Sequence, residues 1–227
     1  MKNWLKKWLL LIWKMLKLTS KLLLPLLVVF LLSPMNPASA GGQNGNHLSL
    51  NLGHTNLDNL SGPGDESFRF RRGQTVALAW GGQVGALRTE YRFSYSRSDL
   101  ARFYKNSSSS NDGRIEQYAL SLNFHERRSL PPFRWDYRAF WFLGLGLSRV
   151  ELDASDANQS SYDDHDYSWK LRGGLGLEVP LTENSFLAAG GEIFSTESLS
   201  FEDQAGEDQS FGSLDGRSLF LEYRWLY

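Results

Sequence analysis

Apolar and polar residues alternate with a period of two along most of the chain after residue 46. This period is typical of β-strands, because successive side chains of a strand point to opposite faces. The alternation predicts eight strands, at residues 47–57, 74–82, 86–98, 114–126, 134–152, 167–179, 185–196 and 216–227. The expected fold class is therefore all-β.

The connections between these strands alternate between long and short. Long polar connections cover 58–73, 99–113, 153–166 and 197–215, and short turns lie at 83–85, 127–133 and 180–184. This order describes an antiparallel up-and-down arrangement with both ends on the side of the short turns. Short turns on one side, longer loops on the other and an even strand number are typical of transmembrane β-barrels in bacterial outer membranes.

The distribution of charge between the two strand faces separates a soluble barrel from a transmembrane one. A soluble barrel is apolar inside and polar outside. In the predicted strand 86–98, however, a continuous apolar face that includes Tyr91 and Phe93 lies opposite a face with Arg88 and Glu90. Burying these charges in a soluble core would be costly. We therefore predict an eight-stranded antiparallel up-and-down transmembrane β-barrel, with lipid outside and charges in the lumen.

Strand parity also predicts the contents of the lumen. Six bases and five acids are expected there: Arg88, Arg92, Arg138, Lys170, Arg172, Arg224, Glu90, Asp136, Glu178, Glu192 and Glu222. An eight-stranded barrel is only just wide enough for its interior side chains to fill. We therefore expect an ion network that plugs the lumen. The alternative is a narrow ion-conducting path that opens when the pairs exchange partners.

The first forty residues differ chemically from the rest. They contain six lysines, no acid and an apolar run at 22–32, followed by Ala38, Ser39 and Ala40. A basic, then apolar, then small-residue order is typical of a signal peptide, here with cleavage after Ala40. The predicted domains are a signal peptide at 1–40 and a barrel domain at 41–227. An uncleaved anchor helix is disfavoured, because lysines interrupt every window of the about 20 apolar residues needed to span a membrane.

The predicted mature chain is acidic. Removing residues 1–40 changes the formal net charge from −1 to −7. This balance argues against nucleic acid as a partner, since phosphate backbones are usually bound by a clustered basic face. The chain has no cysteine, a count that fits export but decides little.

The last predicted strand ends in alternating large apolar residues. Tyr223, Trp225 and Tyr227 share one face, and the chain stops on the aromatic residue. This pattern resembles the carboxy-terminal signal of outer-membrane barrels that the barrel assembly machinery reads. Residues 47–227 as a whole resemble the small eight-stranded barrels of the opacity-protein and outer-membrane-protein-A superfamily, often grouped as porin-like. The resemblance implies the outer membrane of a Gram-negative cell, with lipid and lipopolysaccharide as partners.

Charged and polar residues gather in the predicted long loops. The loop at 153–166 contains several aspartates, and we expect it to be a solvated, mobile tip, as we do for Ser107–Ser110. Binding of divalent cations by these carboxylates is an alternative, although their spacing matches no calcium-loop motif. Arginines at 69, 71 and 72 are candidates for contacts with lipid phosphates.

Catalytic candidates are few in the predicted mature chain. Its histidines are His47, His54, His125 and His165, and none has a serine and an acid placed as a hydrolase requires. His125 is expected to point into the lumen. We therefore predict no enzymatic activity, no cofactor and no metal site. The expected function is envelope integrity, adhesion or surface interaction with an unidentified ligand at the cell surface. The alternatives are a small porin or ion channel and, third, a lipid A-modifying enzyme.

Overall fold

The computed structural model describes residues 45–64, 66–105, 108–110, 112–129, 137–155, 161–203 and 205–227. The predicted signal peptide and its cleavage site lie outside these residues and stay a prediction. The strands are β1 (Gly45–Leu57), β2 (Leu60–Ser61), β3 (Ser67–Phe70), β4 (Gly73–Val84), β5 (Leu87–Lys105), β6 (Ser108–Ser110), β7 (Asp112–Ser129), β8 (Arg138–Ser155), β9 (Ser161–Thr182), β10 (Ser185–Glu202) and β11 (Asp208–Leu226). The part of the chain that is described contains no helix long and apolar enough to cross a membrane.

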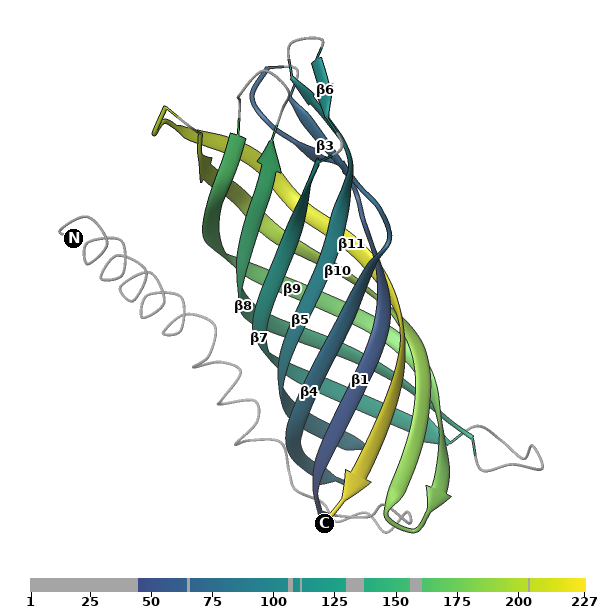
Figure 1. Cartoon of the computed structure of the whole chain (residues 1–227). Coiled ribbons are helices and arrows are strands. Elements are labelled where there is room, and N and C mark those ends of the chain that lie inside the picture. Colours follow the sequence, from purple (N-terminus) through teal and green to yellow (C-terminus); the bar gives the residue numbers. More distant parts are fainter. Residues whose placement is uncertain are drawn as a thin grey trace, which may run out of the picture. The chain divides into compact units, whose positions relative to one another are not determined.

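Eight of these strands close into a ring of antiparallel neighbours (Figure 1). The order around the ring is β1, β4, β5, β7, β8, β9, β10 and β11, and β11 pairs back with β1 from Leu226 opposite His47 to Gly216 opposite Leu57. The predicted eight-stranded antiparallel up-and-down barrel is confirmed. The short connections and the carboxy terminus lie at one end, here called the turn end, and β3 and β6 lie at the other, the loop end.

The outer face near the turn end is covered by large apolar side chains. Examples on three strands are Leu50, Leu143 and Leu219, each about half exposed or more. An apolar surface of this extent is stable against lipid and not against water. This belt contains, among others, Leu48, Leu52, Val76, Leu78, Trp80, Tyr91, Phe93, Leu120, Trp141, Leu145, Leu171, Leu175, Leu177, Ile193, Leu221 and Tyr223.

Four of the eight ring strands, β5, β9, β10 and β11, run far beyond the predicted ends toward the loop end. β5 continues to Lys105 and β9 already begins at Ser161, so the prediction of long polar loops at 99–113, 153–166 and 197–215 was wrong. The strands were cut short because the polarity of their two faces changes, although inward and outward positions continue to alternate. In β8 the even positions face inward throughout, but the outer face changes from Leu145 to Glu151 while the inner face changes from Ser148 to Leu152. The side that is apolar therefore switches from outside to inside.

The inward apolar residues of these extensions form a compact core, which we call the apolar cap. The β2–β3 hairpin, predicted as part of a polar loop at 58–73, contributes to it. Phe68 of β3 stacks on Phe103 of β5 at 4.4 Å between ring centroids, and Tyr162 of β9 meets both rings edge-on. The cap consists of Leu60, Phe68, Phe70, Leu100, Phe103, Ile115, Val150, Leu152, Ala154, Tyr162, Leu199, Phe201, Phe211 and Leu214.

A hydrogen bond joins the hairpin region to the wall of the barrel. The Tyr162 hydroxyl donates to the Glu66 carboxylate at 2.6 Å. Burial raises the pKa of Tyr162, and the hydrogen bond to Glu66 and its negative charge act in the same direction. The tyrosine is therefore a neutral donor at physiological pH.

The described parts of the segments predicted to be mobile belong to strands. Ser108–Ser110 form β6, which pairs with β5. The paired ladder between β9 and β10 ends at Lys170 opposite Thr196. Beyond that point, Asp166 accepts a hydrogen bond from the Ser200 amide and Asp164 one from the Glu202 amide, each at 2.8 Å. These aspartates replace ladder bonds and are not a freely solvated tip.

Candidate functional site in the barrel lumen

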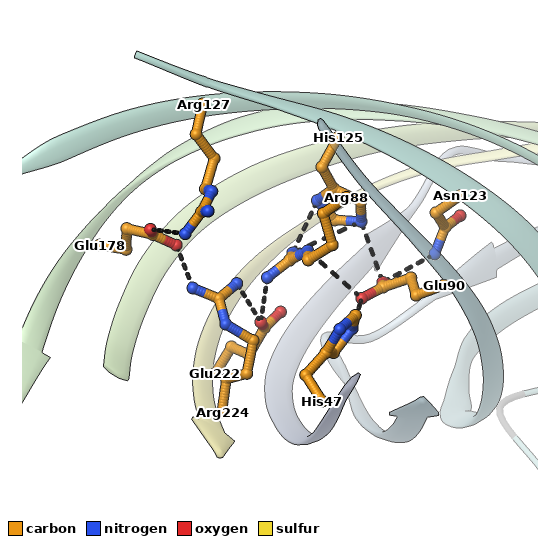
Figure 2. A network of polar contacts seen from close by, with 9 residues as sticks. All are labelled: His47, Arg88, Glu90, Asn123, His125, Arg127, Glu178, Glu222 and Arg224. Carbon is orange, nitrogen blue, oxygen red and sulfur yellow. Dashed lines mark hydrogen bonds and ion pairs between the residues drawn. The ribbon is translucent and has the colours of Figure 1, made fainter. Parts of the chain in front are cut away.

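Ion pairs connect opposite sides of the lumen near the turn end (Figure 2). Glu178 of β9 accepts a hydrogen bond from Arg127 of β7 at 3.0 Å and another from Arg224 of β11. Glu222 accepts one from Arg88 at 3.2 Å. We call the buried charges Arg88, Glu90, Arg127, Glu178, Glu222 and Arg224 the ion-pair layer. Arg127 also donates to the Gly85 carbonyl in the β4–β5 turn, which fixes the layer to the turn end.

Glu90 is the centre of a second group in this layer. It lies 3.0 Å from His125 Nε2 and 3.4 Å from His47 Nε2, and accepts a hydrogen bond from the Asn123 amide at 3.0 Å. His125 Nδ1 lies 2.7 Å from an Arg88 nitrogen, which can only donate. His125 therefore accepts at Nδ1 and donates at Nε2, which is the neutral form of the ring (Figure 2).

Two further lumen bases, Arg172 and Lys170, lie nearer the loop end than the ion-pair layer. Arg172 pairs with Glu192 and lies over the Phe142 ring. Lys170 donates to the Gln117 side-chain oxygen at 2.6 Å, and its ammonium is 4.0 Å from the centre of the Phe194 ring.

The other predicted lumen residues have different surroundings. Arg92 is buried, but forms no ion pair with a carboxylate of the described residues. Arg138 is half-buried, with its guanidinium 5.6 Å from the centre of the Phe186 ring. Asp136 lies outside the described residues. The described members of the predicted lumen set are thus ion pairs and cations on aromatic rings, with Arg92 in neither group.

The site also contains residues that the prediction left out. Arg127 was assigned to a turn because Pro131 and Pro132 follow it, although the parity that places His125 inside continues to Arg127. His125 was predicted to face inward, without a role in the network. His47 and Asn123 complete the contacts of Glu90. Extending the parity of the predicted strand 114–126 up to the turn would have added Arg127.

Aromatic rings and glycines pack together beside the charges. Phe140, Phe142 and Phe220 form a second buried cluster with Ala188. A Cβ placed on Gly174 would come within 2.6 Å of the Phe142 ring, and one on Gly176 equally close to Phe140. These glycines therefore provide the surface on which the rings lie.

Several buried polar atoms of the lumen have no hydrogen-bond partner within the described part of the chain. They include Arg92 Nε, Gln117 Nε2, Ser49 Oγ and both side-chain amide atoms of Asn51. All four side chains are buried. Since buried polar groups are normally satisfied, these atoms need small polar partners that the described side chains do not supply.

The last strand has two chemically distinct faces, as its sequence suggests. Tyr223, Trp225 and Tyr227 are exposed on the outer face, whereas Glu222 and Arg224 are buried in the lumen. β11 pairs with β1 on one side and β10 on the other, so it closes the ring.

The outer wall of β7, β8 and β9 near the loop end carries charges of both signs. Cross-strand neighbours include Arg114 beside Asp153 and Glu151 beside His165. A shallow pocket on this wall is lined by Arg114, Glu116, Arg149, Glu151, Leu152, Asp153, Asp163, Asp164 and His165. In the described ranges, no three His, Cys, Asp or Glu side chains are arranged to hold a metal ion.

Comparison with known proteins gives a consistent family and fold. The family model described as outer membrane protein beta-barrel domain matches residues 24–218. The fold is similar to that of Neisserial surface protein A, with a TM-score of 0.54 and 16% identity over 83% of this chain and 100% of that one. It is also similar to outer membrane protein OprG from Pseudomonas aeruginosa, with a TM-score of 0.55 and 12% identity over 82% and 99% of the two chains. No curated protein sequence matches this chain.

Proposed function

This chain belongs to the outer membrane protein beta-barrel domain family, and from that premise we propose that it is a non-enzymatic, non-conducting barrel that holds a rigid polar surface above the outer membrane. Its location is the outer membrane. In such barrels the short turns face the periplasm and the loop end faces the cell exterior. The role expected of this surface is envelope integrity, adhesion or another contact at the cell surface.

The observation that carries the proposal is that two separate layers fill the lumen. The ion-pair layer crosses it near the turn end, and the apolar cap fills it near the loop end. The cap includes aromatic rings from four ring strands and the β2–β3 hairpin, packed edge-on and face-on. A hydrated ion would have to displace both layers to cross.

The alternative of a small channel requires more than the exchange of ion-pair partners. Rearranging Arg88 and Glu222 would open only the layer at the turn end. The cap would still present buried aliphatic and aromatic side chains, which offer no ligand to an ion. The structure therefore favours the plug over the channel.

We propose a non-enzymatic protein because of where its histidines lie. His47 and His125 both contact Glu90 inside the lumen, within the ion-pair layer. No serine hydroxyl among the described residues hydrogen-bonds to either ring. His165, on the outer wall, lies beside Asp164 at 3.7 Å and has an aromatic neighbour in Tyr167. A hydrolytic relay needs a nucleophile within reach of its base.

We propose two kinds of partner for this barrel. The apolar belt would contact outer-membrane lipid and lipopolysaccharide, because its exposed leucines and aromatic residues need an apolar environment. Tyr223, Trp225 and Tyr227 would contact the barrel assembly machinery during insertion, because they form one exposed row on the closing strand. The ligand of the external surface is not specified by the described side chains.

Single-cysteine labelling tests the proposed surface. The chain contains no cysteine, so each variant carries one thiol. A membrane-impermeant maleimide added to intact cells is expected to label Asp153→Cys, whose side chain is exposed on the outer wall. Leu152→Cys, in the cap, and Leu145→Cys, in the belt, should stay unlabelled. Labelling of Leu152→Cys as fast as of Asp153→Cys would mean that the cap is open to water.

The same assay tests the assembly signal. Tyr227→Ala, combined with Asp153→Cys, should lower the amount of labelled protein at the surface. Leu219→Ala, on the same face of β11 but remote from its end, is the matched control and should change that amount little. Equal losses in both variants would rule out a special role for the terminal aromatic residue.

A further inference from the structure

The buried charges of the lumen do not balance. Among the described residues the buried bases are Arg88, Arg92, Arg127, Lys170, Arg172 and Arg224, and the buried acids are Glu90, Glu178, Glu192 and Glu222. Two positive charges are therefore in excess.

The two bases in excess are those without a carboxylate partner. The other four buried arginines each lie within ion-pair distance of a glutamate. Lys170 contacts a neutral amide and an aromatic ring. Arg92 is only 3% exposed and forms no ion pair within the described part of the chain. Because an arginine keeps its proton, its buried charge needs a counter-charge or strong hydration.

The remaining predicted lumen acid, Asp136, lies outside the described residues and does not enter this balance, which is made for the described residues alone.

One register row connects Arg92 and Lys170 across the lumen wall. In ring order it runs Ser49, Ala79, Arg92, Ser121, Gly146, Lys170. All six face the lumen and are buried. Apart from the two bases, the row holds only small side chains.

Hydrogen-bond donors without acceptors lie around the same row. Arg92 Nε and Gln117 Nε2 are buried and unpartnered, and Gln117 uses its oxygen to accept from Lys170. The Ser49 hydroxyl, also buried and unpartnered, can donate as well. Donors in excess, next to positive charge in excess, call for an occupant that accepts hydrogen bonds and carries negative charge.

We propose that the lumen binds a small inorganic anion, such as chloride, on the row of small side chains between Arg92 and Lys170. The ion-pair layer lies on one side of this site and the apolar cap on the other. A larger anion would need the space that the rings of Phe142 and Phe194 fill beside Arg172 and Lys170. The anion neutralises the buried excess of positive charge and completes the filling of the lumen.

Anomalous diffraction with bromide tests the site directly. The protein is folded from urea into detergent with bromide as the only small anion, so that the ion need not cross either layer afterwards, and is then crystallised. A bromine peak is expected within about 3.5 Å of the Arg92 guanidinium, near hydrogen-bond distance for this ion. Arg92→Met, which keeps the length of the side chain without its charge, should lack the peak. A wild-type crystal with water density or no density at this position would overturn the proposal.

Thermal unfolding gives an independent readout. A ligand that binds only the folded state raises the unfolding temperature. Replacing gluconate by bromide at constant ionic strength should therefore stabilise the wild type and Arg97→Met, which removes an exposed arginine of the outer wall. Arg92→Met should gain no stability from bromide. If Arg92→Met does not fold, Lys170→Met is used instead, with the same expected result. The same gain in the lumen variant as in Arg97→Met would show a general salt effect and contradict the site.

Discussion

At the scale of single residues, Glu178 makes the contacts that hold the ion-pair layer together. It joins β9 to Arg127 on β7 and to Arg224 on β11, two strands that are not neighbours of each other in the ring. The sequence places Glu178 and Arg224 in the lumen by parity. It does not reveal which base meets which acid, because contacts across a lumen depend on the stagger of all strands around the ring.

Glu178→Gln is expected to destabilise the barrel strongly. The variant removes the negative charge between two buried arginines, and breaking a buried pair by changing one partner costs about 3 to 5 kcal/mol. The measurement is the free energy of unfolding by urea in lipid vesicles. Glu197→Gln, at an exposed position of β10, should change this value by less than about 0.5 kcal/mol. Similar values for both variants would show that Glu178 is hydrated rather than buried in an ion pair.

At the scale of strands, the predictions were right about faces and wrong about lengths. The period of two correctly placed Leu143 and Leu145 outside and Phe142 inside. The strand predicted to end at 152 continues to Ser155 in β8, and β5, β9, β10 and β11 extend six to eight residues beyond their predicted ends, because strand and loop were separated by where the outer face becomes polar. A strand that leaves the membrane keeps its period but exchanges its apolar face, so polarity alone marks the membrane boundary and not the strand end.

Glycines on β9 show how a strand accommodates lumen rings. A Cβ on Gly174 would lie 2.6 Å from the Phe142 ring and 2.5 Å from the Gly191 carbonyl oxygen. On the neighbouring Gly173, which faces outward, it would meet nothing closer than 3.5 Å. Sequence alone gives no reason to distinguish these two adjacent glycines by packing, since the ring that needs the space comes from β8.

Gly173 and Gly174 provide a matched test of lumen packing. Gly174→Ala should lower the free energy of unfolding by about 1 to 3 kcal/mol, the usual cost of forcing an extra carbon into a packed interior. Gly173→Ala should change it by less than about 0.5 kcal/mol, as for surface substitutions. Urea titrations of both variants in the same vesicles provide the comparison. A neutral Gly174→Ala would mean that the Phe142 ring does not rest on this glycine.

At the scale of the whole molecule, the barrel consists of two zones of opposite polarity along one set of strands. The zone in the membrane is apolar outside and charged inside, whereas the zone at the loop end is charged outside and apolar inside. The second zone has the arrangement of a small soluble barrel. It supports the charged outer wall of β7, β8 and β9 on a packed core rather than on loops.

The fold class could be predicted from the sequence, but the packed zone at the loop end could not. Strand number, antiparallel order and compartment follow from alternation and loop asymmetry, and the family match agrees with them. The apolar cap was not predicted, because its members, such as Leu60, Phe103 and Phe211, are widely separated in segments rich in polar residues. Only the closed ring brings them together.

Single-channel recording measures most directly whether the two layers close the lumen. Protein folded in detergent and inserted into planar lipid bilayers should give no unitary current steps above the bare membrane. Glu222→Ala, which disturbs the ion-pair layer alone, should also give none, because the apolar cap remains in place. Reproducible unitary currents from the wild-type protein would contradict a closed lumen and would favour a small channel instead.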